Sequence, residues 1–177
     1  MRCALLCTFG ILLQNDRNCI GILLQTRGNN ARKTSQHMNR GEAGMRYYIA
    51  DCHFYHKNLL TEMDNRGFES VEQMNEVMIE KWNKKVHIRD EVVILGDLSL
   101  GNGKETNEIL CRLKGRLCLI RGNHDERYLR DKIFDASRLE WIKDYAEIHD
   151  NKRKIVLMHY PIFCYNGQFR CGAMAHR

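Results

Sequence analysis

Proline is nearly absent from this sequence of 177 residues, and Pro161 is its single example. The chain therefore has no proline-rich linker, and its length suits one domain with a sizeable core. It also has no apolar run long enough to span a bilayer, so we expect no membrane partner. Residues 45–177 hold 22 basic and 20 acidic residues, so charge gives this part no nucleic-acid footprint.

Cysteine is plentiful, but no two cysteines form a C-x-x-C pair. The eight are Cys3, Cys7, Cys19, Cys52, Cys111, Cys118, Cys164 and Cys171. Several lie inside apolar segments, and the chain is larger than a typical disulfide-rich secreted domain. We therefore expect reduced thiols that act as small core residues, which favours a cytoplasmic location.

Residues 1–44 differ in composition from the rest, with six Lys or Arg and two Asp or Glu. Their second half is polar, basic and without hydrophobic periodicity. This composition predicts a poorly ordered extension outside the domain, which begins near Met45, where the first strong strand starts. Because the segment is basic, binding of nucleic acid through this arm is an alternative function.

Strands alternate with helices from Met45 onward. Apolar runs predict strands at 45–50, 91–95, 116–120, 145–149 and 154–159. Helical periodicity and capping residues predict helices at 70–86, 104–114 and 126–134. The last two strands enclose the turn sequence DNKR and are expected to form a hairpin. The alternation predicts an α/β domain with a largely parallel core sheet.

Polar side chains follow four of the predicted strands, in the sequences ADCH, LGDL, RGNHD and MHYP. They belong to Asp51, His53, Asp97, Asn123, His124 and His159. Each alone is more often a cap or a hydrogen-bonded rim residue, but their repetition at successive strand ends favours a shared site. In open α/β sheets ligands bind beyond these ends, so the side chains should gather at one edge. Carboxylate, amide and imidazole donors without thiolate suit first-row divalent ions.

The motifs DCH, GDLSLGN, GNHD and HYPI occur in this order with helices between them, and through them the sequence resembles the calcineurin-like metallophosphoesterases. The resemblance covers about residues 45–172, and IADCHFYHKNLL is most similar to the small bacterial and phage branch. It implies a β-sandwich flanked by helices with a βαβαβ core. It also implies hydrolysis of a phosphate mono- or diester, a nucleotide or nucleic acid included, by hydroxide activated between two divalent ions such as Mn, Fe, Zn or Ni.

The resemblance implies a ligand role for five of the strand-end residues. Asp51 and His53 bind one metal. Asn123 and His159 bind the second. Asp97 bridges both, since a carboxylate can hold two cations with its two oxygens.

Two further residues of the GNHD motif receive catalytic roles. The resemblance implies that His124 is not a ligand but faces the substrate phosphate as general acid or charge stabiliser. Asp125 orients His124 by accepting its ring N–H, or else it caps the helix expected at Glu126. The sequence favours neither alternative.

Four other residues lie near the motifs. His56 and Asn58 match the pattern of the branch, but HKN is also typical of a polar helix start. Asn102 and Arg121 lie close to motif ends and could contact phosphate, although Arg121 is equally typical of a solvated charge at a strand end.

The family has one more motif, Gly-His-x-His, which supplies one His to each metal, and this sequence does not contain it. We therefore expect residues 45–177 to be a phosphoesterase domain that is incomplete at its C-terminus. Three protein ligands per metal predict weaker metal binding and reduced activity. A non-catalytic binding protein that keeps the fold is the alternative.

Overall fold

The computed structural model describes residues 24–26, 44–60, 66–169 and 173–176. The strands are β1 (Leu24–Thr26), β2 (Arg46–Ile49), β3 (Glu91–Ile94), β4 (Arg116–Ile120), β5 (Leu139–Lys143), β6 (Tyr145–Asp150), β7 (Arg153–Met158) and β8 (Ala173–Ala175). The helices are α1 (Val71–Lys85), α2 (Gly103–Arg112) and α3 (Glu126–Leu129), with 3-10 turns η1 (Lys57–Leu59) and η2 (Ala136–Arg138). None of the helices in these ranges is long and apolar enough to cross a membrane.

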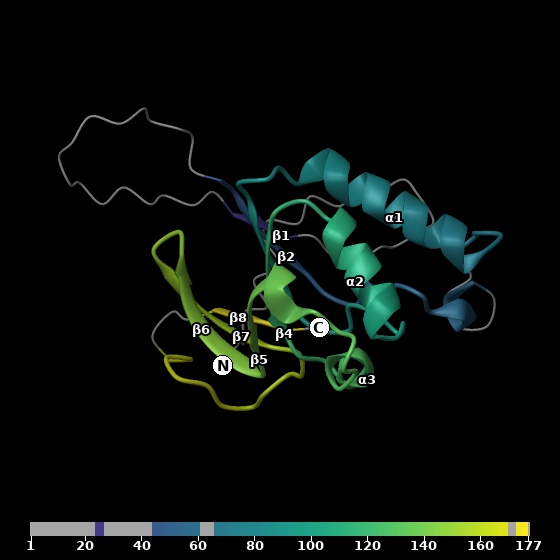
Figure 1. The fold of residues 1–177 in the computed structure, drawn as a ribbon. Helices are drawn as coiled ribbons and strands as arrows, with labels where there is room; N and C mark the ends of the chain where they lie inside the picture. The colour runs from purple at the N-terminus through teal and green to yellow at the C-terminus, as the bar shows by residue number, and fades with distance from the viewer. Residues whose placement is uncertain (1–23, 27–43, 61–65, 170–172, 177) are drawn as a thin grey trace.

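The strands form two sheets (Figure 1). The larger has the order β1-β2-β3-β4-β5, in which β2 to β5 are parallel and β1 is antiparallel. The smaller has the order β6-β7-β8, and β6 with β7 is the expected hairpin. The expected α/β sandwich with a parallel core sheet and flanking helices is thus confirmed.

The central strands are apolar throughout because both of their faces are covered. In β3, Val92 and Ile94 pack in the cluster that contains α1 and α2 side chains. The alternate residues Val93 and Leu95 pack with Leu157 of the smaller sheet. Parallel strands buried on both faces have hydrophobic residues at successive positions, and this pattern made β3 and β4 predictable from the sequence.

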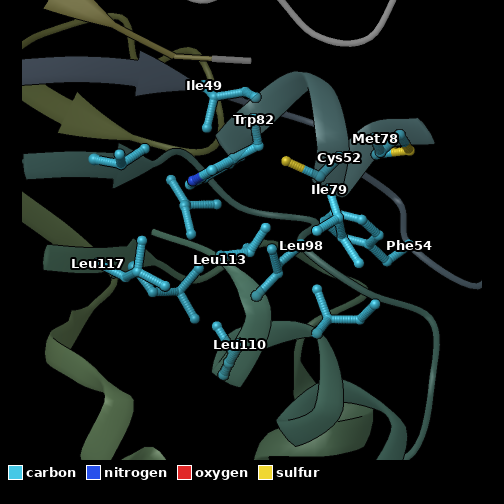
Figure 2. Packing of buried hydrophobic residues seen from close by; sticks show 14 of the residues in the cluster. Ile49, Cys52, Phe54, Met78, Ile79, Trp82, Leu98, Leu110, Leu113 and Leu117 are labelled. Atoms are coloured by element: carbon cyan, nitrogen blue, oxygen red, sulfur yellow. The ribbon is translucent and has the colours of Figure 1, made fainter. Parts of the chain in front are cut away.

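Helix α1 covers the sheet with Met78, Ile79 and Trp82, which belong to the same buried cluster as Leu110 and Leu117 (Figure 2). All five side chains are buried. Burying one such side chain stabilises the fold by about 1.5–3 kcal/mol. This layer holds the parallel strands in place from the helix side.

Both long helices begin at a side-chain cap. The Oγ of Ser70 accepts a hydrogen bond from the backbone N–H of Gln73 at 3.1 Å. Asn102 and Glu105 form a complete capping box at the start of α2, with bonds of 2.9 and 2.7 Å. Asn102 therefore acts as a helix cap, and the alternative of a phosphate contact has no support from its hydrogen bonds.

Two parts of the element prediction were wrong. The helix expected at 126–134 ends as α3 at Leu129 and continues as turns. Strand β5 was missed because its residues are mostly exposed or half-buried, so LEWIK lacks the apolar run of a central strand. It extends the parallel sheet beside β4.

One piece of the predicted N-terminal extension belongs to the larger sheet. Leu24–Thr26 pairs with β2, with Leu24 opposite Tyr48. The domain boundary near Met45 stays a prediction. Residues 1–23 and 27–43 lie outside the described residues, so the expectation for them stays a prediction.

The cysteine prediction holds for two of the four cysteines in the described ranges. Cys52 and Cys118 are buried, whereas Cys111 and Cys164 are exposed, and all four are free thiols. Burial raises the pKa of both core thiols to about 12, which keeps them protonated. The prediction that the cysteines are core residues was wrong for Cys111 and Cys164. Cys3, Cys7, Cys19 and Cys171 lie outside the described residues.

A buried hydrogen bond connects the two sheets. The hydroxyl of Tyr48 in β2 donates to Asp150 Oδ2 in β6 at 2.7 Å. We expect Tyr48→Phe to lower the free energy of unfolding by about 1–3 kcal/mol, because a hydrogen bond to a buried carboxylate is lost. Urea unfolding measures this. The control Tyr145→Phe removes an exposed hydroxyl bonded to Glu147, and equal losses in both variants would contradict the prediction.

Candidate metal centre

The segments after β2 and β3 remain side by side beyond the ends of the strands. The backbone N–H of Asp51 donates to Gly96 O at 3.1 Å, and that of His53 donates to Asp97 O at 2.9 Å. The pairing continues to a parallel bridge between Phe54 and Ser99. This continuation places the DCH and GDL motifs against each other.

Three residues of these motifs have left-handed backbone conformations. The φ angles are 55° at Asp51, 52° at His53 and 55° at Asp97. Such values are uncommon outside glycine and tend to occur at functional sites, where the surrounding structure compensates for the strain. Cys52 between the first two is buried, as expected for a packing residue that is not a ligand.

The carboxylate of Asp97 lies at the centre of the cluster. Its Oδ1 accepts the backbone N–H of His124 at 2.9 Å, but its Oδ2 is buried without a hydrogen-bond partner. The Nε2 atoms around Oδ2 belong to His159 at 3.6 Å, His53 at 3.7 Å and His124 at 4.0 Å. Ligand bonds of about 2.1 Å place the donors of one ion roughly 3–4 Å apart. The unpaired oxygen and its neighbours therefore fit a divalent cation.

His159 is held in one tautomer. It is fully buried, and its Nδ1 lies 2.7 Å from Leu95 O, which can only accept. A proton on Nδ1 leaves Nε2 as an acceptor, the state required of a metal ligand. This Nε2 lies 3.2 Å from Asn123 Oδ1, so two acceptors face each other, as expected around a cation. Tyr160, which sequence reasoning missed although it follows His159, donates to the same Asn123 oxygen at 3.4 Å.

His53 lies on the other side of Asp97. Its Nε2 is 3.3 Å from Asp51 Oδ1, and its Nδ1 is buried without a partner. Burial lowers the pKa of His53, although the carboxylates of Asp97 and Asp51 oppose this shift. A neutral imidazole between two carboxylates is suited to bind a metal.

The structure thus brings together all six strand-end residues. Among the described residues, His53, Asp97 and His124 form a group that could hold an ion, because their ligand atoms lie within 4.8 Å of one another. This group contains His124, which we predicted to be a non-ligand. Its side chain is 41% exposed, whereas that of Asp97 is fully buried, so His124 lies on the open side of the cluster. The division of metal ligands between two ions stays a prediction.

Asp125 has neither of the two roles expected from the sequence. It is fully buried and has no side-chain cap bond to α3 and no bond to the His124 ring. Its oxygens accept bonds of 2.7–2.9 Å from the backbone N–H groups of Asp97, Leu98 and Gly122 and from the Tyr128 hydroxyl. Burial raises the pKa of Asp125, and these bonds oppose the shift. Asp125 therefore fastens the end of β3 to the loop after β4, which fixes Asp97.

Two other residues near the motifs, Arg121 and His56, differ in their distance from the cluster. Arg121 forms a two-bond ion pair with Asp144 at 2.6 and 2.5 Å on an exposed surface, which favours the surface-charge interpretation. His56 is buried, with its ring centroid 5.2 Å from that of His53 and 6.1 Å from that of His124. It precedes η1, so it begins a helical turn and also borders the cluster.

Gly96 has no room for a side chain. Its φ is +91°, and an added Cβ would lie 2.3 Å from His159 Nδ1. We expect Gly96→Ala to lower the free energy of unfolding by about 3 kcal/mol through backbone strain and collision. Gly167→Ala is the matched control, because its φ is +89° but the nearest atom is 3.7 Å away. Gly167→Ala should lower the free energy of unfolding by only about 1 kcal/mol. If thermal unfolding gives similar losses for the two variants, the predicted collision with His159 is wrong.

The chain is similar to a protein family and to two known proteins. The family model described as calcineurin-like phosphoesterase matches residues 47–173. A protein of Methanocaldococcus jannaschii, described as uncharacterized protein MJ1445, is 37% identical over 125 residues, which are 70% of this chain and 62% of that protein. The crystal structure of the protein of unknown function AQ665 from Aquifex aeolicus matches with a TM-score of 0.51 and 30% identity, over 67% of this chain and 61% of the other. The chain thus spans less than two thirds of the length of both relatives.

Proposed function

Because the chain belongs to the calcineurin-like phosphoesterase family, we propose that it is a hydrolase that cleaves phosphate esters with divalent metal ions. The observation that carries the proposal is the buried Oδ2 of Asp97, which has no hydrogen-bond donor and is surrounded by three imidazole Nε2 atoms. Burying a carboxylate oxygen without a partner is costly unless a cation compensates.

We propose that these residues hold two ions. Asp51 and His53 would hold one, Asn123 and His159 the other, and Asp97 would lie between them. Such ions, when bound, supply positive charge that makes water more acidic and neutralises the phosphoryl oxygens. This division follows the family resemblance.

The protein's own groups position the site and the substrate. His159 is oriented by Leu95 O, so that its Nε2 points to Asp97 and Asn123. His124 fixes Asp97 with its backbone N–H, while its ring lies on the open side. From there the ring would contact a phosphate oxygen and stabilise its charge.

We also place the protein in the cytoplasm. The exposed free thiols of Cys111 and Cys164 support this proposal, since exposed cysteines remain reduced most readily in a reducing compartment. The partner that the site requires is a phosphoester substrate.

The test is hydrolysis by chelator-treated protein. We expect no release of p-nitrophenol from p-nitrophenyl phosphate or bis(p-nitrophenyl) phosphate until Mn²⁺ is added, and a steady rate afterwards. Equal rates with and without the ion would contradict metal-dependent hydrolysis. Binding of Mn²⁺ without cleavage of either ester would favour the non-catalytic alternative.

A further inference from the structure

A groove of about 480 Å³ opens beside the metal centre. Its lining includes Tyr55, His56, Asn58, Leu100, Glu105 and Arg127. Ligand pockets usually measure about 300–1,000 Å³, so the groove can hold an organic group and is not filled by a phosphate alone.

His56 joins the groove to the metal centre. It lines the groove, and its ring centroid lies 5.2 Å from that of the expected ligand His53 and 6.1 Å from that of His124. The residue is only 9% exposed, and its Nδ1 is buried without a hydrogen-bond partner. An organic group bound in the groove would therefore lie next to a phosphate bound at the metal centre.

Two residues of the groove lining are held by hydrogen bonds to neighbouring segments. The backbone N–H of Tyr55 donates to Asn75 Oδ1 of α1 at 3.1 Å, and φ at Tyr55 is +63°. Two other lining residues are joined to each other, since Arg127 Nη1 donates to Leu100 O at 3.1 Å. Preformed walls lower the entropy lost on binding.

The chemistry of the lining suits a nucleoside. The half-buried Tyr55 ring and Leu100 offer an aromatic and an apolar surface to a flat base. The exposed Asn58 offers both a donor and an acceptor for sugar hydroxyls or base edges. The positive charges of Lys57 and Arg127 are balanced by the carboxylates of Glu72 and Glu105, so the lining is neutral overall and suits an uncharged nucleoside. A lipid chain would find too few apolar walls.

We propose that this groove binds a nucleoside that forms one arm of a phosphodiester whose phosphate lies at the metal centre. The inference rests on the proposed function and extends it, because it names the substrate class. Nucleoside binding by the groove, with His56 between the groove and the cluster, would make the protein selective for nucleotide diesters over simple ones.

The test compares two diesters with the same leaving group, thymidine 5′-(p-nitrophenyl phosphate) and methyl p-nitrophenyl phosphate. With Mn²⁺ present, we expect kcat/KM to favour the thymidine ester by about tenfold or more, mainly through KM. Asn58→Trp changes an exposed residue and fills the groove, so the preference should fall below about threefold. Arg127→Ala, a second exposed position, should lower it as well. Lys81→Trp on the exposed face of α1 is the control and should retain the preference.

The outcomes separate the two proposals. If the unmodified chain cleaves neither ester, the proposed function fails and this inference fails with it. If the chain cleaves both at equal kcat/KM, phosphoester hydrolysis stands and the nucleoside groove is wrong. Nucleoside binding in the groove is also contradicted if Asn58→Trp and Arg127→Ala prefer the thymidine ester as strongly as Lys81→Trp does.

Discussion

Asp97→Asn is expected to abolish metal retention and to lower phosphoester hydrolysis by at least about 100-fold. The amide keeps one oxygen to accept the backbone N–H of His124, so the loop geometry survives. The other position becomes an NH₂ group, which cannot bind a cation. Metal content after gel filtration and turnover of bis(p-nitrophenyl) phosphate measure the two effects.

The same variant should not lose stability in the absence of metal. Oδ2 of Asp97 is buried without a partner, so the substitution removes an uncompensated charge, and the new NH₂ group faces the acceptor Nε2 of His159, which lies 3.6 Å from Oδ2. Glu80→Gln on α1 is the control, since it makes the same chemical change on an exposed helix face. A variant at Asp97 that retains metal and full turnover would contradict the bridging role.

Asp125→Ala should cause the largest loss of stability, about 3–5 kcal/mol. The carboxylate accepts four buried hydrogen bonds, three of them from backbone N–H groups at the ends of β3 and β4. Its removal leaves these donors without an acceptor in the core. Urea unfolding of the metal-free protein isolates this effect from metal binding.

The control for Asp125 is another aspartate that accepts backbone N–H groups. Asp131 accepts those of Gly103 and Ile133 at 2.8 and 3.0 Å, but the residue is only half-buried, so Asp131→Ala should lower the free energy of unfolding far less. If Asp125→Ala unfolds like the unmodified chain yet loses turnover, Asp125 acts on His124 after all, and the structural role is wrong.

The sequence predicted the central strands and the polar residues after them because both depend on local patterns. Strands β3 and β4 are buried on two faces, and Asp97 or Asn123 follows where each run ends. Parallel strands bring such ends to one edge whatever their separation in the chain. The gathering of the site residues therefore follows from strand order.

The roles of other residues depend on contacts that no local pattern reveals. Asp125 was assigned to His124 or to a helix cap because both are its neighbours in sequence, whereas its partners Asp97 and Leu98 precede it by almost thirty residues. The left-handed conformation of Asp51 and His53 is likewise imposed by pairing with the segment after β3. Strand β5 likewise could not be predicted locally, because it lies at the edge of the sheet and its residues are mostly exposed or half-buried.

The most direct test of the account is anomalous diffraction from crystals of this chain soaked in Mn²⁺. The account predicts two anomalous peaks on either side of Asp97, one within ligand distance of Asp51 and His53 and one within ligand distance of Asn123 and His159. Absence of any peak near Asp97, or a single ion held by His53, Asp97 and His124, would contradict it.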